Sequence, residues 1–174
     1  MTATARCFVA VEPGAELVAA LRRMGRPSRP GLRWVPEEQW HVTLQFFADV
    51  DPDGLVQALG SVRAPGPVEA VAGPRPGRLG PHVWTLPVDG LSGLAAAVAV
   101  ATAPLRSESV VDGDLPFRGH LTLARIRRPE AGRDLPAPEL RCRWEVQEIL
   151  GFRSQLGSGG AVHHVLGRWP LRPG

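Results

Sequence analysis

Two copies of the tetrad His-x-Thr-x constrain this chain more than any other feature of its sequence. They are His41-Val42-Thr43-Leu44 and His120-Leu121-Thr122-Leu123, and each lies in a stretch with the pattern of a β-strand. Successive side chains of a strand point to opposite faces, so the His and Thr of each copy share one face while the apolar residues enter the other. The sequence therefore predicts two strands that each present one imidazole and one hydroxyl together.

Two such strands side by side in a cleft would suit acid-base chemistry on a phosphate. One imidazole can take a proton from the attacking oxygen, the other can protonate the leaving oxygen, and the hydroxyls can hold the non-bridging oxygens. This scheme requires no metal ion and no other cofactor. The alternative is two unrelated strand histidines, each followed by a Thr of the kind common in strands. Matching apolar flanks and the separation of 79 positions, from His41 to His120, favour the shared site.

Length and composition indicate one domain, or two small lobes with a common core. The chain has 174 residues, of which 44% are hydrophobic, enough for a sizeable interior. The apolar run at residues 7–11 is too short for a signal peptide, and no run approaches 18 apolar residues. We therefore expect a soluble, cytoplasmic protein without membrane contact. Cys7 and Cys142 have no metal or redox spacing, and we expect both to be buried packing residues.

The charge of the chain favours an anionic partner only modestly. All 20 basic residues are Arg, the net charge is +3 and the pI is about 10. Arg side chains match phosphate oxygens, but an excess this small does not establish nucleic-acid binding. Other site types are disfavoured, because the sequence has neither a Gly-x-Ser-x-Gly elbow nor a Gly-rich phosphate loop. His82, His163 and His164 lack Cys or carboxylate partners at ligand spacing, so we expect no metal site.

Local patterns predict strands interleaved with two or three helices. Pro87 indicates the end or the edge of its strand, and a second lobe is expected to begin near it. We expect helices at residues 13–24, from 51 to about 59, and at 91–105, and strands at residues 7–11, 32–35, 40–50, 68–72, 82–88, 117–126, 143–150 and 161–169, with a turn-rich loop at 109–115. This order indicates an α+β fold with largely antiparallel sheets.

Almost the whole chain resembles the 2H phosphoesterases, and within them the bacterial and archaeal RNA 2′,3′-cyclic phosphodiesterases once described as 2′-5′ RNA ligases. The segments that carry the resemblance are Arg6-Cys7-Phe8-Val9-Ala10-Val11, Trp34-Val35-Pro36, Trp40-His41-Val42-Thr43-Leu44-Gln45-Phe46-Phe47, Phe117-Arg118-Gly119-His120-Leu121-Thr122-Leu123-Ala124-Arg125, and the closing segment from Gly160 to Leu171. It implies one domain over residues 1–174, made of two pseudo-repeated lobes with one tetrad each. The implied fold is bilobal, with two antiparallel sheets facing across a V-shaped cleft and helices packed outside.

The resemblance also implies an activity and a set of site residues. The activity is metal-independent hydrolysis of an RNA 2′,3′-cyclic phosphate end to a 2′-phosphate, with His41 as proton donor and His120 as proton acceptor. The residues alone do not decide which histidine is the acid. Thr43 and Thr122 would bind the phosphate, and Arg125 would contact the RNA phosphate or form a structural ion pair. Strict alternation from His120 points Arg125 away from the cleft, so the first role needs a bend or bulge after Thr122.

Three positions depart from the family pattern: Gly119 replaces a common Pro, Ala48 a common Gly, and His163 a usual Tyr. The expected partners are RNA with cyclic phosphate ends or small cyclic nucleotides; we expect no protein partner, no cofactor and a monomer. Two alternatives stay open, an ATP-independent 2′-5′ RNA ligase and a nucleotide- or RNA-binding module with little turnover. Trp34 and Trp40 could stack on a base, although packing is the more common role of aromatic residues beside strands.

Overall fold

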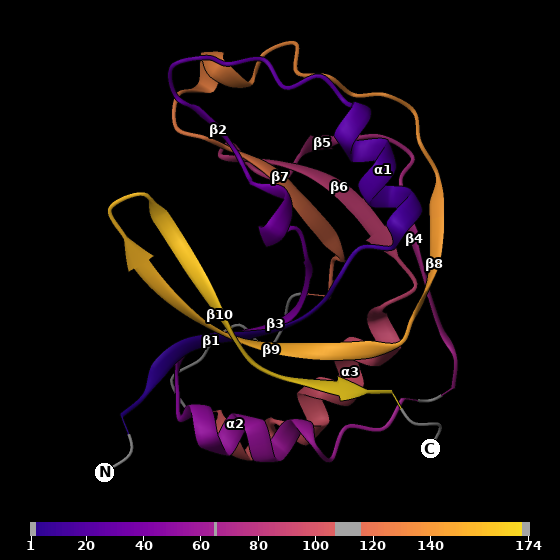
Figure 1. Cartoon of the computed structure of the whole chain (residues 1–174), viewed down its shortest axis with the longest axis vertical. Helices are drawn as coiled ribbons and strands as arrows, with labels where there is room; N and C mark the ends of the chain where they lie inside the picture. The colour runs from indigo at the N-terminus through magenta and orange to yellow at the C-terminus, as the bar shows by residue number, and fades with distance from the viewer. Residues whose placement is uncertain (1–2, 65, 107–115, 172–174) are drawn as a thin grey trace.

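A ten-stranded antiparallel sheet with three α-helices forms the framework of the protein in the computed structural model (Figure 1). The structure describes residues 3–64, 66–106 and 116–171. The strands are β1 (Ala5–Val11), β2 (Leu32–Trp34), β3 (Val42–Val50), β4 (Val68–Ala72), β5 (Gly77–Arg78), β6 (Val83–Asp89), β7 (His120–Ile126), β8 (Cys142–Val146), β9 (Glu148–Gly157) and β10 (Gly160–Pro170). The helices are α1 (Ala15–Arg23), α2 (Pro52–Leu59) and α3 (Ser92–Ala101), with short 3-10 turns at Glu37–Gln39, Ala103–Leu105 and Pro129–Gly132. The α+β class predicted from the sequence is confirmed.

The strand order is β10-β9-β1-β3-β7-β6-β4-β8, with β2 added beside β7 and β5 beside β6. We call the strands β10, β9, β1 and β3 the β1 half, and the others the β7 half. Between β3 and β7 the register contains a single pair, Val42 opposite Leu121, and both side chains are fully buried. Because these residues are the second positions of the two tetrads, the two halves join where the two motifs lie side by side.

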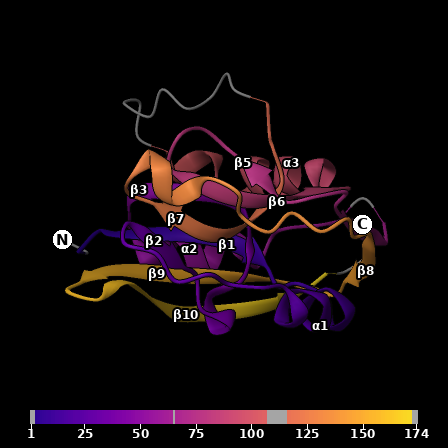
Figure 2. The ribbon, with the colours of Figure 1, turned by 90° about the horizontal axis from the view of Figure 1, so that it is seen from above.

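The two halves do not follow one another along the chain. The helix α1 and the strand β2 come between β1 and β3, and the hairpin of β9 and β10 returns at the end of the chain to pair with β1. Figure 2 shows this hairpin along one side of the molecule and α3 on the opposite side. One hydrophobic cluster runs through both halves and includes Val9 and Leu44 as well as Leu86 and Leu123.

Three expectations about the elements need correction. The stretch 143–150 is not one strand, because β8 ends at Val146 and pairs with β4, whereas β9 starts at Glu148 and pairs with β1. Pro87 lies in an interior strand, at the point where the partner of β6 changes from β5 to β4, so its missing N–H breaks no regular ladder. Cys142 is only partly buried, because β8 lies at the end of the strand order. The loop expected at 109–115 lies outside the described residues.

The helices form where the sequence predicts them. The Asp51 carboxylate caps α2 by accepting hydrogen bonds from the backbone N–H groups of Asp53 and Gly54, each at 3.2 Å. The helix α2 packs against β9 and β10, α3 packs against β3, and α1 packs against β8. No helix in the described ranges is long and apolar enough to cross a membrane.

Candidate active site

The two tetrads line one pocket between the halves of the sheet. It has a volume of about 270 Å³, and its wall includes the five residues predicted to act on or bind the phosphate: His41, Thr43, His120, Thr122 and Arg125. The remaining lining residues come from the segment 33–39, from Leu79 and Val83, and from Ala161 and His163 on β10. The structure thus brings together residues that are far apart in the sequence.

Both histidines are held in the same way. His41 Nδ1 lies 2.7 Å from the carbonyl oxygen of Gln39, and His120 Nδ1 lies 2.8 Å from that of Arg118, two residues earlier in each case. A carbonyl oxygen can only accept, so each Nδ1 carries the proton and donates it. Each neutral imidazole therefore has its lone pair on Nε2, the atom that can exchange a proton with a ligand.

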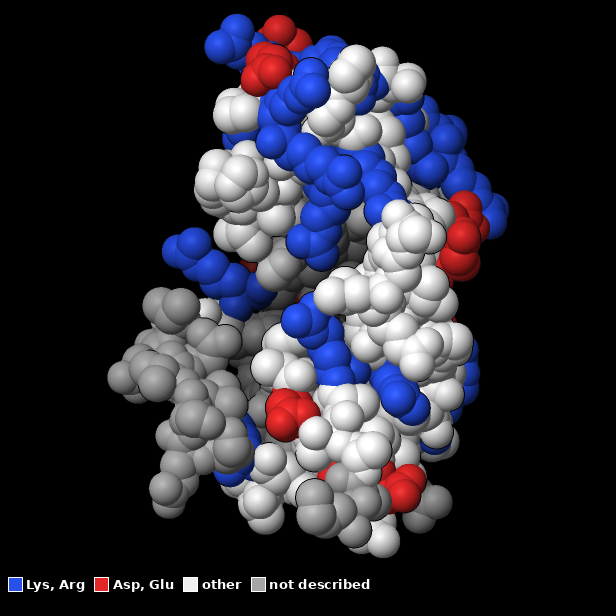
Figure 3. Space-filling model, turned by 90° about the vertical axis from the view of Figure 1, so that its left-hand side faces the viewer, with Lys and Arg blue, Asp and Glu red and all other residues white. Residues whose placement is uncertain are grey.

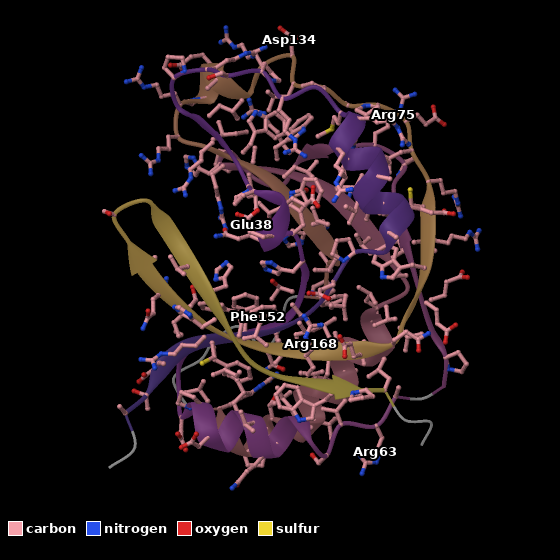
Figure 4. All side chains as sticks on the ribbon, in the orientation of Figure 1. Glu38, Arg63, Arg75, Asp134, Phe152 and Arg168 are labelled. Carbon is pink, nitrogen blue, oxygen red and sulfur yellow. The ribbon has the colours of Figure 1, made fainter. Side chains whose placement is uncertain are left out.

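The His41 ring is packed among aromatic rings. Phe8 stacks on it at a centroid distance of 4.7 Å, Phe152 stacks on Phe8 at 4.8 Å, and the Phe152 ring lies 6.2 Å from the His41 ring. The His163 ring meets His41 edge-on at 5.7 Å and 90°. Figure 4 places Phe152 near the middle of the molecule. This packing leaves the His41 imidazole little freedom to rotate.

Burial lowers the pKa of His41 to about 4, with smaller contributions from the positive charges of His163, Arg125 and His120. The hydrogen bond to the Gln39 carbonyl acts in the opposite direction. Burial also lowers the pKa of His163, assisted by Arg125 and His164. The ligand-free pocket therefore disfavours additional positive charge, and an anion bound there would relieve that penalty.

The position of Arg125 depends on a β-bulge. In the pairing of β6 with β7, Trp84 lies opposite Ala124 but Thr85 lies opposite Thr122, so Leu123 is the extra residue. The bulge shifts the alternation by one position, and Arg125 then lines the same pocket as Thr122. The sequence required a bend at this point for Arg125 to reach the cleft, and the structure contains it.

Gly119, where the family commonly has Pro, allows a close approach of two strands. Its carbonyl accepts from Val88 N–H at 2.9 Å, and a Cβ at Gly119 would overlap with the Val88 carbonyl oxygen. A Pro at this position would therefore need a shift of the backbone.

The two tryptophans near the first tetrad differ in their surroundings. Trp40 is buried and its indole N–H donates to the Val35 carbonyl, as its packing role predicts. Trp34 lines the pocket and its indole N–H donates to the Pro27 carbonyl.

Sequence reasoning missed Gln39. Its carbonyl orients His41, and its side-chain amide donates to the Ala161 carbonyl at 3.1 Å, which ties β10 to the segment before the first tetrad. The backbone carbonyl at this position could come from any residue type, so no motif marks it. The sequence shows His163 as a departure from Tyr and as a histidine without partners at metal-ligand spacing, but its contact with His41 depends on a pairing of distant strands. Within the described ranges, no three His, Cys, Asp or Glu side chains are grouped so that they could hold a metal ion.

Known proteins similar to this chain include phosphoesterases of the LigT type. Residues 9–70 match the family described as LigT like Phosphoesterase. An RNA 2′,3′-cyclic phosphodiesterase of Thermus thermophilus is 31% identical, over 96% of this chain and 90% of that protein. The crystal structure of TT0787 from the same organism is 30% identical with a TM-score of 0.82, over 97% of this chain and 98% of that one. Crystal structures of E. coli LigT share the fold; the complex with 3′-AMP has a TM-score of 0.74 at 23% identity, over 97% of this chain and 98% of that one. With a relative this similar over nearly its whole length, the chain belongs to the LigT-like 2H phosphoesterase family.

Proposed function

We propose that this protein is an RNA 2′,3′-cyclic phosphodiesterase that works by two-histidine acid-base catalysis without a metal ion. The observation that carries the proposal is the matched pair of imidazoles, each with its Nδ1 bound to a backbone carbonyl and each lining the same pocket. The relative from Thermus thermophilus that bears this activity in its name supports the choice of substrate. A cyclic phosphate is an anion, which the pocket with Arg125 favours.

The proposed reaction opens the ring in one displacement at phosphorus. His120 Nε2 takes a proton from water as its oxygen attacks, the bond between phosphorus and O3′ breaks, and His41 gives a proton to O3′. The product is a 2′-phosphate with a free 3′-hydroxyl. The Thr43 and Thr122 hydroxyls donate to the non-bridging oxygens, and Arg125 balances the charge that develops there.

His41 must be protonated to act as the donor, although its pKa in the ligand-free protein is about 4. Substrate supplies the missing interaction, because a phosphate anion beside the imidazole favours its charged form. If His41 remained neutral in the complex, the two histidines would exchange roles. The pH profiles of residual kcat in His41→Ala and His120→Ala distinguish the two assignments, since loss of the donor removes the decline of kcat at high pH and loss of the acceptor removes the decline at low pH.

The proposal extends to the whole chain as one domain, 1–174, of two lobes with a tetrad each. The pocket would be the cleft between the lobes, since its wall takes His41 from the β1 half and His120 from the β7 half. The cleft would then bring the acid and the base to the same phosphate from opposite sides.

The test is hydrolysis of a short RNA that ends in a 2′,3′-cyclic phosphate, in excess EDTA, by wild type, His41→Ala and His120→Ala. We expect a 2′-phosphate product with wild type and a loss of kcat of roughly 10²- to 10⁴-fold in each variant. His164→Ala is the matched control, because His164 is exposed on β10 and does not line the pocket. Full activity in either tetrad variant refutes the mechanism, and RNA binding without turnover by wild type indicates a binding module.

A further inference from the structure

A second hollow continues from the candidate active site along β2 and β7. Arg33, His82, Arg125, Ile126 and Arg127 line it, and its volume is about 430 Å³. We call it the arginine groove. Two of its residues, Arg33 and Arg125, also line the candidate active site, so the two hollows share a wall. A ligand that fills the first can therefore extend into the second.

The arginine groove brings positive charges close together, which lowers the stability of the folded protein. Arg33 and Arg125 are directly opposite one another in the antiparallel register of β2 and β7, where like charges destabilise a sheet. Within the described residues neither of them, nor Arg127, forms an ion pair with a carboxylate. Four arginines elsewhere do so: Arg22, Arg75, Arg143 and Arg168. An anion in the groove would supply the missing counter-charge.

The groove offers several donors on a fixed backbone. His82 Nδ1 lies 3.2 Å from the Ile126 carbonyl and donates to it, so the donors that can reach a ligand in the groove are the arginine side chains. The backbone of Arg127 is fixed by its N–H bond to the Gly31 carbonyl at 2.7 Å. The Arg33 guanidinium lies against the tip of the β9–β10 hairpin, where a Cβ at Gly160 would overlap with it. Arg side chains bind phosphate with two parallel N–H bonds, which suits an oligoanion in an open groove.

The surface of the molecule agrees with this arrangement. Figure 3 shows the face that holds the tip of the hairpin and the ends of β2 and β7, and a band of arginine side chains descends on it from the top toward a hollow in the middle. Acidic side chains on this face lie beside the top of the band, at the edge of the face and below the hollow, whereas the lower part of the band is free of them in this view. A strand of nucleic acid that leaves the active site on this side would pass over positive charge.

We propose that the arginine groove binds backbone phosphates of the RNA strand on the 5′ side of its cyclic end. The inference rests on the proposed function, because it takes the cyclic phosphate to lie between His41 and His120. The terminal nucleotide then occupies the candidate active site, and the next phosphates contact Arg33 and Arg127. The protein therefore prefers oligonucleotides to cyclic mononucleotides as substrates.

The experiment compares kcat/KM for a tetranucleotide RNA with a 2′,3′-cyclic end and for 2′,3′-cyclic CMP, in wild type, Arg33→Gln and Arg127→Gln. We expect the ratio of the two values to favour the tetranucleotide in wild type and to fall roughly three- to tenfold in each variant. The logarithm of the affinity for single-stranded RNA should also depend less on the logarithm of the salt concentration, by a slope of about 0.7 for each lost phosphate contact. Arg63→Gln is the control, since Arg63 lies at the opposite end of the molecule from β2 (Figures 1 and 4) and should leave the ratio unchanged.

A binding measurement separates this inference from the proposed function. Fluorescence anisotropy with the same tetranucleotide ending in a 2′-phosphate requires no turnover and reports the salt slope directly. If wild type hydrolyses neither substrate but Arg33→Gln and Arg127→Gln still reduce the slope, the function fails and the groove stands. If wild type shows no preference for the tetranucleotide, or if both variants keep the wild-type ratio and slope, the groove does not bind RNA and the inference is overturned.

Discussion

The stacked rings around His41 have an electrostatic consequence that a sequence motif does not contain. Burial against Phe8 removes water from the imidazole, and the resulting pKa of about 4 makes the neutral ring the stable form at pH 7. The tetrad identifies the histidine, but the depression of its pKa comes from the packing of β1, β9 and β10 around it. At this scale the sequence could predict which side chains line the pocket and could not predict the pKa shift of His41.

Protonation of His41 should lower stability on acidification. An unfolded histidine has a pKa of about 6.5, so the unfolded chain binds more protons than the folded protein between pH 6.5 and pH 4. The contribution of neutral His41 is fully present above pH 6.5 and is lost as the pH falls toward 4, on the order of 3 kcal/mol in total.

Urea unfolding of wild type and His41→Gln at several pH values between 4 and 7 measures this effect. The difference in free energy of unfolding between the two proteins should change across this range, and His164→Gln should follow wild type. An equal pH dependence in His41→Gln and wild type would show that His41 titrates normally in the folded protein.

Among the elements, β7 shows which structural features a local sequence pattern can predict. Its alternation predicts the faces of His120 and Thr122, and the bulge at Leu123 then brings Arg125 to the same pocket. The sequence indicated that such a bulge was needed for this role, because Arg125 is an odd number of positions from His120. By contrast, the division of residues 143–150 into β8 and β9 depends on which distant strands they pair with, and a local pattern carries no information on that pairing.

Arg125→Gln tests the function of the bulge. Arg125 is exposed, lines the pocket and makes no ion pair with a carboxylate among the described residues, so its loss should change stability by less than about 0.5 kcal/mol. If the side chain stabilises the developing charge on the phosphate, kcat/KM should fall roughly 10²- to 10³-fold. Steady-state kinetics and urea unfolding of the same preparation, with Arg63→Gln beside it, measure both quantities. A loss of stability with unchanged kinetics would assign Arg125 a structural role.

A substitution at the N-terminus of α2 should lower the stability of the protein and leave its activity unchanged. Asp51 accepts two backbone hydrogen bonds at its N-terminus, and this helix packs against β9 and β10 outside the pocket. Asp51→Ala should therefore cost about 1 kcal/mol of free energy of unfolding and leave kcat/KM for the cyclic phosphate unchanged. Asp49→Ala, an exposed residue of β3, is the matched control. An Asp51 variant as stable as wild type would show that the cap contributes nothing.

For the whole molecule, the sequence predicted the class and the site better than the connectivity. Two tetrads on strands were enough to place both histidines at one pocket, because residues with joint chemistry must meet in the fold. The sequence suggested one half-domain followed by another, whereas α1 and β2 belong to the β7 half and the final hairpin returns to the β1 half. This interleaving comes from pairings between distant segments, and the turn and helix signals on which the prediction relied are local.

The interleaved chain predicts that the two halves unfold together. Leu21 on α1 and Leu55 on α2 are both fully buried, the first over the β7 half and the second under the β1 half, and both belong to the same hydrophobic cluster. Leu21→Ala and Leu55→Ala should each cost about 2 to 5 kcal/mol and shift one common transition. Tryptophan fluorescence and far-UV circular dichroism, followed in urea, should give coincident unfolding curves for each variant. Midpoints that do not depend on protein concentration would agree with a monomer.

Independent lobes would behave differently: each variant would then lower the stability of one half alone and separate the curves into two transitions. Coincident curves would mean that a loss of packing in either half reaches the pocket, because His41 and His120 come from opposite sides of the pair Val42–Leu121.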